Sequence, residues 1–138
     1  MSPDDLADIH RRAMTVTAAW GAPTIKGFLA APGAVLVTRE EAFALGRVMA
    51  DEAELLTLVV APDRQRRGMG RACLRDFEGQ VRAKGARRVF LEVADSNEAA
   101  VALYHAEGFR RDGVRHGYYE TAQGPLDAVL MSKVLVSD

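Results

Sequence analysis

The sequence predicts an α/β fold in which a mixed central sheet of about six strands carries helices on both faces. In the middle of the chain a strand, a helix and another strand follow one another, and this order favours a parallel pair joined by a right-handed crossover. On either side of this unit, short apolar segments separated by turn-forming residues predict antiparallel pairs. With 138 residues and no linker or internal repeat, the chain is expected to form one domain over residues 1–138.

The N-terminal half is expected to supply two helices and three strands. Apolar residues at helical spacing predict a helix over Asp4–Ala13, and a second short helix is expected after Pro23. Ala34–Val37 and Phe43–Met49 predict a hairpin-like pair of strands. The segment Leu55–Val60 is apolar at both alternating sets of positions, which is typical of a strand covered on both faces.

The C-terminal half is expected to alternate between helices and strands. Its elements, in order, are a helix over Met69–Lys84, a strand over Arg88–Ala94, a helix ended by Gly108, and a final pair of strands over Phe109–Tyr119 and Leu126–Val136. A capping box is expected to begin the second of these helices, because Glu98 follows Asp95 by three residues.

The charge, the hydropathy and the single cysteine exclude several classes of protein. A net charge of −1 makes nucleic-acid binding a poor prediction, and no long apolar run predicts a membrane span. The acidic start Met1–Asp5 does not have the layout of a signal peptide, and the lone Cys73 fits a reducing compartment. We therefore expect a cytoplasmic protein. His10, His105 and His116 share no metal-ligand spacing, so no metal site is predicted.

A basic loop with two glycines follows the strand predicted to end at Val60. Gly68 and Gly70 lie where the next helix begins, and free backbone N–H groups and the helix dipole attract anions there. Arginines crowd around them, at positions 64, 66, 67, 71 and 75. The dinucleotide-binding pattern Gly-x-Gly-x-x-Gly is not completed, because Cys73, which is expected in the core, occupies the third glycine position. The loop is predicted to bind an anion or, alternatively, to be only a tight turn into a helix.

The residues of this loop resemble a known superfamily. Gln65-x-x-Gly68-x-Gly70, after a Val-Ala-Pro strand end, resembles the coenzyme A loop of the GNAT superfamily of N-acetyltransferases. Similar segments follow at Leu91–Asn97, Leu103–Tyr104 and Glu107–Phe109, and the resemblance runs from about residue 52 to residue 131. It implies a GNAT fold and acetyl-coenzyme A as the acetyl donor. Because the chain begins almost directly at its first helix, the family's first strand is expected to be missing or very short.

The resemblance also implies which residues hold the donor. Its pyrophosphate would lie on the backbone of the loop, and its pantetheine arm would pair with the backbone of a strand like an added strand. The implied residues are Gln65, Arg66, Arg67, Gly68, Met69, Gly70 and Arg71 for the pyrophosphate, and Leu58, Val60 and Asn97 for the arm. Asn97 has the alternative of being a plain helix cap.

Within the superfamily, the chain is most similar to the RimI-type N-terminal acetyltransferases, which acetylate the N-terminal alanine of a small-subunit ribosomal protein. The similar segments are Leu91–Val93, Arg115–Tyr119 and Asp127–Met131, and Trp20 resembles the tryptophan between the first two helices of those proteins. The resemblance implies the N-terminus of a ribosomal protein as partner and an acceptor groove lined by Arg115, Tyr118 and Tyr119. A lysine or a small-molecule amine is the alternative acceptor, and a non-catalytic acyl-coenzyme A sensor is the alternative in another class. We expect a monomer or a weak dimer.

Two side chains are candidates for moving protons during transfer to an amine. Glu92 shares one face of its strand with Phe90 and Ala94, and apolar neighbours raise the pKa of a carboxyl toward a range useful for a general base. Its alternatives are a solvated strand-end glutamate or an ion pair with an arginine. Tyr104 returns on the following helix and is the candidate acid for the departing thiolate, with a core tyrosine packed with Leu103 as the alternative.

Overall fold

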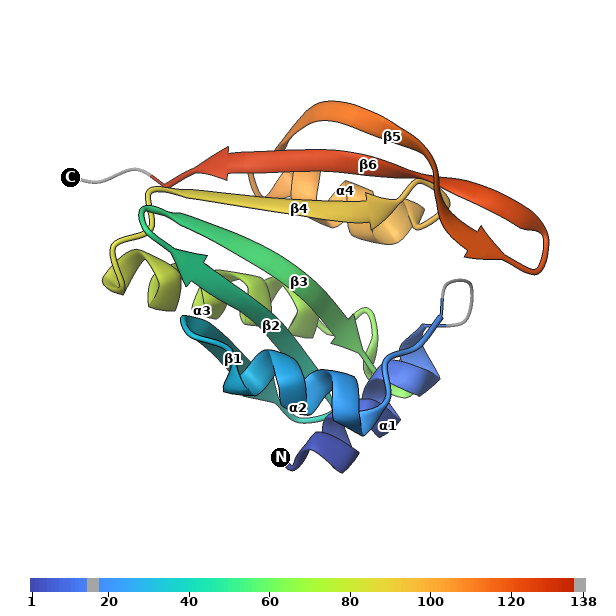
Figure 1. Cartoon of the computed structure of the whole chain (residues 1–138), viewed down its shortest axis with the longest axis horizontal. Helices are drawn as coiled ribbons and strands as arrows, with labels where there is room; N and C mark the ends of the chain where they lie inside the picture. The colour runs from blue at the N-terminus through green and yellow to red at the C-terminus, as the bar shows by residue number, and fades with distance from the viewer. Residues whose placement is uncertain (15–17, 136–138) are drawn as a thin grey trace.

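The computed structural model describes residues 1–14 and 18–135, and its six strands form one mixed sheet in the order β1-β2-β3-β4-β6-β5 (Figure 1). The elements along the chain are α1 (Pro3–Ala13), α2 (Ala22–Ala30), β1 (Ala34–Arg39), β2 (Ala42–Met49), β3 (Glu52–Val60), the 3-10 turn η1 (Pro62–Arg64), α3 (Met69–Ala83), β4 (Arg88–Ala94), α4 (Glu98–Ala106), β5 (Arg110–Thr121) and β6 (Gly124–Val134). In the described part of the chain, no strand precedes α1. The expected last strand reached Val136, which lies outside the described residues.

The pairing of the strands confirms the predicted mixed sheet. β3 and β4 are parallel and are connected through α3, while β1 with β2, β2 with β3, β4 with β6 and β5 with β6 are antiparallel. The parallel pair is short, since its register runs only from Glu52↔Arg88 to Leu55↔Leu91. Beyond Leu55, β3 continues to Val60 without pairing to β4, and the two strands separate (Figure 1).

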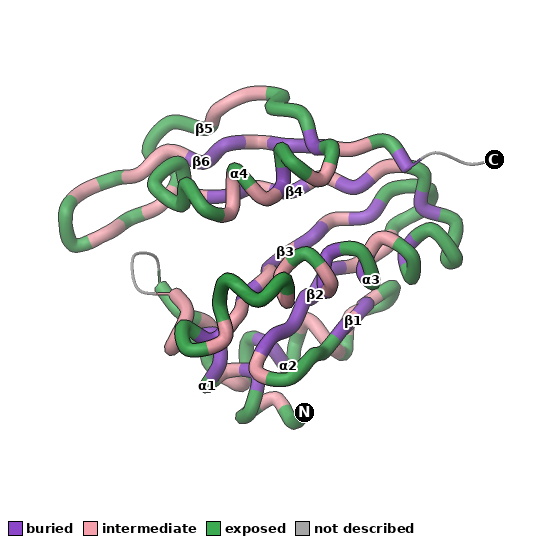
Figure 2. Tube along the Cα trace, turned by 180° about the vertical axis from the view of Figure 1, so that it is seen from behind, coloured by how far each residue is buried: buried purple, intermediate pink, exposed green. Residues whose placement is uncertain are grey.

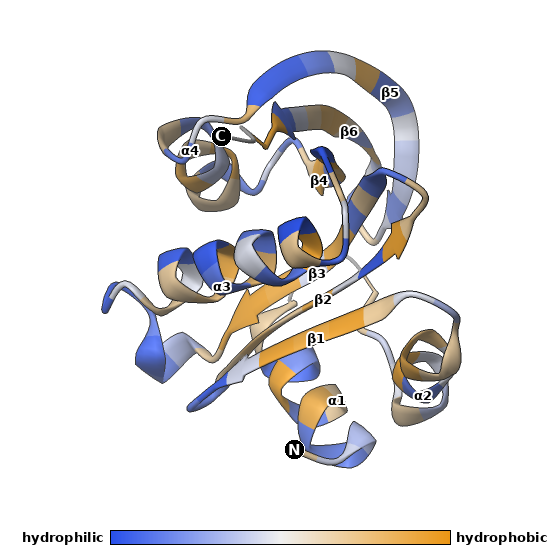
Figure 3. Cartoon of the chain, turned by 90° about the vertical axis from the view of Figure 1, so that its left-hand side faces the viewer, coloured by the Kyte–Doolittle hydropathy of each residue, from blue (hydrophilic) through white to orange (hydrophobic). Residues whose placement is uncertain are grey.

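Helices cover both faces of the sheet, as the sequence predicts. Helices α1 and α2 lie on one face and α3 lies on the other (Figure 3). Phe77 of α3 and Tyr104 of α4 belong to the larger buried cluster, whereas Leu6 of α1 and Ile25 of α2 belong to a second cluster on the opposite face. The buried positions follow the strands in the middle of the molecule (Figure 2). No helix within the described ranges is long and apolar enough to cross a membrane.

A bulge in β3 explains why this strand is apolar at both alternating sets of positions. Thr57 lies opposite Leu45 and Leu55 lies opposite Gly46, so Leu56 is the extra residue. An extra residue reverses the side-chain alternation beyond it. Consequently Leu55 packs into the α3 cluster while Val59 packs into the α1 cluster. The bulge therefore turns the end of β3 relative to β4 at the point where the two strands part.

The start of α4 differs from the sequence-based expectation. Asn97 is the N-cap, and its side-chain oxygen accepts a hydrogen bond from the backbone N–H of Ala100 at 3.2 Å. The predicted capping box between Asp95 and Glu98 is therefore wrong. The backbone N–H of Asp95 instead donates to the carbonyl of Asp127 in β6 at 2.9 Å, so Asp95 still belongs to the sheet edge and the helix begins two residues later.

Candidate active site

A cleft of about 740 Å³ opens where β3 and β4 separate. Five parts of the chain contribute side chains: the end of α1 with the segment after it, the middle of β3, the end of β4, the start of α4 and the hairpin β5–β6. The polar residues that line it are His10, Thr57, Glu92, Ser96, Asn97, Tyr104, Tyr118, Tyr119 and Glu120. The apolar lining includes Met14, Trp20, Leu58 and Val93.

Glu92 lies in β4 with its side chain partly buried at one wall of this cleft. Its Oε1 accepts a hydrogen bond from Nη1 of Arg115 at 2.7 Å, and this bond raises the pKa of the Arg115 guanidinium. The structure therefore shows the arginine pair that the sequence left open as an alternative. The same carboxylate also faces the cleft, so an ion pair and a role in the site are compatible.

Tyr104 lies on α4 and is almost fully buried, at 5% exposure, yet it also lines the cleft. Its ring packs against Phe109 with centroids 5.6 Å apart. Burial raises the pKa of its phenol well above the ordinary value, so the hydroxyl keeps its proton at neutral and moderately alkaline pH. The side chain thus packs in the core, as the alternative interpretation states, and is at the same time a protonated residue of the cleft lining.

The glycine loop leads from η1 into α3 and is exposed from Gln65 to Gly68. Gly68 is the N-cap of α3 with φ 77°, a left-handed conformation that favours glycine, and no side chain caps the helix there. A Cβ at Gly68 would meet nothing within 4 Å, whereas a Cβ at Gly70 would lie 3.4 Å from Leu103 and 3.7 Å from Val60. The first N–H groups of α3 therefore have neither a side-chain cap nor steric cover at Gly68.

The arginines near this loop divide into two groups. Arg64 pairs with Glu40 at 3.1 Å, and Arg71 pairs with Glu107 at 3.2 Å. The predicted phosphate ligand Arg71 is thus engaged by a carboxylate whose pKa is lowered, chiefly by its hydrogen bond from Arg75. Arg66 and Arg67 make no ion pair with any described residue.

Both side chains belong to the exposed part of the loop, immediately before the N-cap of α3. Arg66 has φ 67°, which turns the chain sharply at this point. Among the described ion pairs, none involves Arg66 or Arg67, so their charge is available to an anion at the helix N-terminus. The charge of these two arginines is thus outside the described ion pairs, whereas Arg71 shares its charge with Glu107.

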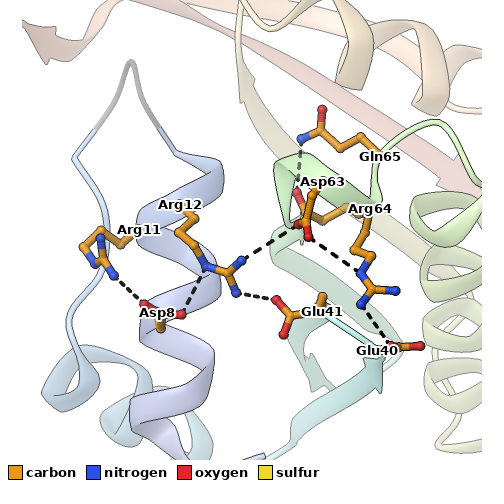
Figure 4. A network of polar contacts seen from close by, with 9 residues as sticks. Asp8, Arg11, Arg12, Glu40, Glu41, Asp63, Arg64 and Gln65 are labelled. Carbon is orange, nitrogen blue, oxygen red and sulfur yellow. Dashed lines mark hydrogen bonds and ion pairs between the residues drawn. The ribbon is translucent and has the colours of Figure 1, made fainter.

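A network of polar contacts attaches the segment before the loop to the rest of the molecule (Figure 4). Arg12 of α1 binds Glu41 in the β1–β2 turn and lies 4.0 Å from Asp63 of η1. The backbone of Glu41 also accepts a hydrogen bond from Ala61 at 2.8 Å. Gln65, which is also predicted to touch the cofactor, donates from Nε2 to the carbonyl of Val60 at 3.1 Å, and this bond holds the end of β3 to the loop.

The hairpin β5–β6 forms the wall of the cleft opposite α1. Its register shifts between Arg115 and Tyr119, and the carboxylate of Asp127 holds this irregular segment by accepting a hydrogen bond from the Gly117 backbone at 2.8 Å. Tyr118 and Tyr119 stand edge to face with centroids 5.0 Å apart, and the Arg115 guanidinium lies 4.1 Å from the Tyr118 ring centroid. Burial raises the pKa of Tyr119 to about 12, so it too stays neutral.

The structure brings some of the predicted site residues together and keeps others apart. The predicted residues that line the cleft are Leu58, Glu92, Asn97, Tyr104, Tyr118 and Tyr119. Arg115 is not part of the lining, but it contacts two lining residues, Glu92 and Tyr118. Val60 packs against the larger core cluster, and the loop from Gln65 to Arg71 lies outside the cleft lining, next to α4 through the contact of Gly70 with Leu103.

Sequence reasoning missed four polar residues of the cleft, namely His10, Thr57, Ser96 and Glu120, and the first two are buried. His10 is 1% exposed, its Nδ1 accepts the backbone N–H of Trp20 at 3.0 Å, and the two rings stack at 4.8 Å. Burial lowers the pKa of His10 to about 4, so the ring is neutral at pH 7 and carries its proton on Nε2. Among the described residues, His10 Nε2 and Thr57 Oγ1 have no hydrogen-bond partner. The available signal was a histidine four residues after Leu6 on the apolar face of α1.

Comparison with known proteins places this architecture in a family. The model of the Acetyltransferase (GNAT) family matches residues 7–109. The [Ribosomal protein bS18]-alanine N-acetyltransferase of Salmonella typhimurium is 45% identical over 94 residues, which are 68% of this chain and 64% of that protein. The alignment thus spans less than two thirds of this relative's own length.

Solved structures agree in fold. The crystal structure of the ribosomal-protein-S18-alanine N-acetyltransferase from Escherichia coli superimposes with a TM-score of 0.87 at 31% identity, covering 99% of this chain and 89% of that one. The PaiA N-acetyltransferase from Thermoplasma acidophilum, solved in complex with coenzyme A, has a TM-score of 0.56 at 23% identity, covers 68% of this chain and 53% of that one, and shows the shared fold alone. Because the family model matches residues 7–109, well over half of the 138 residues, the chain belongs to the acetyltransferase (GNAT) family.

Proposed function

We propose that the protein is an N-acetyltransferase that moves the acetyl group of acetyl-coenzyme A to the N-terminal α-amine of a protein. The observation that carries this proposal is that Glu92 and Tyr104 line one cleft beside the parted strands β3 and β4. A base for the amine and an acid for the leaving thiolate are what direct transfer to an amine requires. The similarity to ribosomal-protein alanine N-acetyltransferases supports the N-terminal alanine of a ribosomal protein as the acceptor.

The residues of the glycine loop fit the pyrophosphate of the donor. The start of α3 at Gly68, Met69 and Gly70 has no side-chain cap and supplies backbone N–H groups, and Arg66 and Arg67 supply positive charge that takes part in no ion pair among the described residues. We assign Gln65 and Arg71 supporting roles, because Gln65 binds the end of β3 and Arg71 binds Glu107.

The end of β3 fits the pantetheine arm. Beyond Leu55, no described strand pairs with the edge of β3 that faces β4, so the backbone around Leu58 and Val60 can pair with an amide-containing chain, except for the Val60 carbonyl, which accepts from Gln65. Asn97 lines the same cleft and caps α4 through its side-chain oxygen. A contact with the arm would therefore use its side-chain NH2 group. Acetyl-coenzyme A would supply the activated thioester at this point.

In the proposed reaction, Glu92 removes a proton from the acceptor ammonium, directly or through a water. An α-amine has an ordinary pKa near 8, so only about a tenth of it is free at pH 7, and a base raises the reactive fraction. The free amine then attacks the thioester carbonyl, so that a C–N bond forms and the C–S bond breaks. Tyr104, which is protonated at neutral pH because its pKa is raised, gives its proton to the departing thiolate and regains one when the acylated nitrogen loses its second proton. Tyr118 and Tyr119 would hold the residues of the acceptor beyond the amine.

The test offers the full chain acetyl-coenzyme A and two peptides that begin with alanine and contain one internal lysine. One peptide has a free N-terminus and the other has an acetylated N-terminus. Mass spectrometry is expected to find one added acetyl group, at the α-amine of the free peptide only. Modification of lysine in the blocked peptide would show the alternative acceptor, and binding of acetyl-coenzyme A without any transfer would show a sensor.

The physiological acceptor needs a second measurement. Comparing the N-terminal peptides of cellular proteins with and without the gene is expected to show loss of acetylation on a ribosomal protein that begins with alanine. An acceptor of this kind would place the activity in the cytoplasm. An unchanged set of ribosomal N-termini, with another protein affected, would replace the proposed acceptor.

A further inference from the structure

Arg115 occupies a site for a cation at the wall of the cleft. Its guanidinium donates to Glu92 Oε1 at 2.7 Å and lies over the face of Tyr118 at 4.1 Å. A carboxylate together with an aromatic face is a site for ammonium and guanidinium groups generally, since both attract positive charge. The same features would hold the protonated amine of an acceptor.

Arg115 reaches this position from a distance. On β5 it lies opposite Ala128 of β6, and Ala128 lies opposite Ala94 of β4, so the side chain extends across β6 to arrive at Glu92. Its side chain is 51% exposed, compared with 26% for Glu92. A long, half-exposed side chain can leave its partner at low cost, whereas the carboxylate stays where β4 holds it.

The cleft lining offers the arriving amine no other fixed cation to compete with. In the described part of the chain, the lining contains Glu92 and Glu120 and neither lysine nor arginine. His10 is neutral, because burial lowers its pKa to about 4. The amine must therefore compete only with Arg115 for Glu92.

We propose that Arg115 is an internal competitor of the acceptor amine, which enters the site by displacing the guanidinium from Glu92. The inference rests on the proposed function in that it places the amine at Glu92. It adds that Arg115 opposes acceptor binding, whereas a plain groove-lining residue would favour it. One cation replaces another, so the exchange leaves the charge at Glu92 balanced until the amine gives up its proton.

The proposal predicts that removing the guanidinium strengthens binding of the amine. We would titrate the full chain, saturated with coenzyme A so that no transfer occurs, with an alanine-initiated peptide at pH 7 in a calorimeter. Because the ion pair is exposed to solvent and therefore weak, Arg115→Gln is expected to lower the Kd of the free peptide by about two- to fivefold. Arg115→Lys retains a competing charge and is expected to bind close to the wild-type Kd.

Three controls separate competition from an altered fold. Arg111→Gln removes an exposed arginine of the same strand that makes no described ion pair, and it should leave the Kd unchanged. The N-acetylated peptide has no ammonium, so Arg115→Gln should not tighten its binding. In a Glu92→Gln background, Arg115→Gln should give no gain, because the pair is already absent.

The result that overturns the proposal is a Kd for Arg115→Gln that equals or exceeds the wild-type value while circular dichroism shows an intact fold. This outcome is distinct from failure of the proposed function, which appears as a wild-type chain that does not acetylate the N-terminus. If lysine proves to be the acceptor, the titration uses the blocked peptide with its free lysine, since an ε-ammonium competes for Glu92 in the same way. Equal affinities of wild type and Arg115→Gln there would again overturn the proposal.

Discussion

At the scale of single residues, burial sets the protonation state of the tyrosines and of the histidine in the cleft. Tyr104 and Tyr119 are held neutral by desolvation, which raises their pKa, and His10 is held neutral because desolvation lowers its pKa to about 4. Glu92 is accompanied by a cation, Arg115. A cleft of neutral donors around one paired carboxylate is suited to accepting a proton at one point and giving a proton at another.

Replacing Glu92 with glutamine is expected to lower kcat by about a hundredfold at pH 7, because an amide cannot act as a general base. The measurement is the initial rate of thiol release with the free peptide at saturating acetyl-coenzyme A. The matched control is Glu52→Gln. Glu52 lies at the start of β3, and like Glu92 it pairs with an arginine, Arg88, at 2.8 Å. A kcat for Glu92→Gln within about threefold of the wild-type value would reject the assignment, because loss of a general base lowers kcat by much more.

Replacing Tyr104 with phenylalanine keeps the ring against Phe109 and removes only the hydroxyl. We expect kcat to fall by about tenfold or more, with little change in the Kd of coenzyme A, because the acid acts on the leaving thiolate. Since the pKa of Tyr104 is raised, the wild-type proton is retained as pH rises, and kcat should show no loss from this group up to about pH 9. Tyr118→Phe on the exposed hairpin serves as the comparison for losing a cleft phenol; an equal fall in both variants would speak against a special role for Tyr104.

At the scale of elements, two local irregularities create the places where the donor would bind. The bulge at Leu56 in β3 precedes the point where β3 and β4 part, and the left-handed N-cap Gly68 opens the start of α3. Each irregularity leaves backbone groups without their usual partners. Unpaired backbone at the end of one strand and at the start of the next helix suits a long ligand that carries both amides and phosphates.

Replacing Gly68 with valine is expected to weaken coenzyme A binding by tenfold or more, on the order of the loss of one or two charge-assisted hydrogen bonds. A β-branched residue disfavours φ 77°, so the turn must change, and the side chain would stand where phosphate oxygens approach. The measurement is calorimetric titration with coenzyme A. Gly79→Ala in the same helix meets nothing within 4 Å and is the control that should leave affinity unchanged. An unaltered Kd for Gly68→Val would remove the loop from the site.

At the scale of the whole molecule, two apolar layers on opposite faces of the sheet hold the cleft in shape. The α3 layer supports β4 and α4, which carry Glu92 and Tyr104, while the α1 layer supports His10 and Trp20 on the other side. The network from Arg12 to Asp63 joins the second layer to the segment before the glycine loop (Figure 4). The acceptor side and the donor side are therefore built on one continuous scaffold.

The buried His10 predicts how the stability of this scaffold depends on pH. The unfolded chain binds a proton on this residue as pH falls below about 6.5, whereas the folded chain resists protonation until about pH 4. The unfolded state therefore binds more protons between these values, so stability falls as pH falls through this window. From pH 7 to pH 5 the loss from His10 should be about 2 kcal/mol.

Urea unfolding at pH 7 and pH 5 measures this loss. His10→Gln keeps an acceptor for the Trp20 N–H but does not titrate, so its stability should change by about 2 kcal/mol less than that of wild type over this range. His105→Gln, on the exposed side of α4, is the comparison and should keep the wild-type difference. Identical slopes for wild type and His10→Gln would show that His10 is not held neutral.

Much of the fold and part of the candidate site could be predicted because they depend on local patterns. Helical spacing located α1 and α3, and alternation with turn residues located the hairpins, since each reflects which side chains of one element are buried. The glycine pair before α3 is likewise a local signal for a left-handed turn into a helix. Neighbouring residues carry all of this information.

What the sequence by itself determined is thus the order and type of the elements, the mixed sheet and the loop at Gly68. Only the tertiary structure decided that Arg115 binds Glu92, that Arg71 is taken by Glu107, and that α4 begins at Asn97. The physical reason is that periodicity records burial within an element, whereas an ion pair or a cap depends on how strands and helices distant in the sequence come to lie beside one another. Charged side chains have several partners within reach along the chain, and packing selects among them.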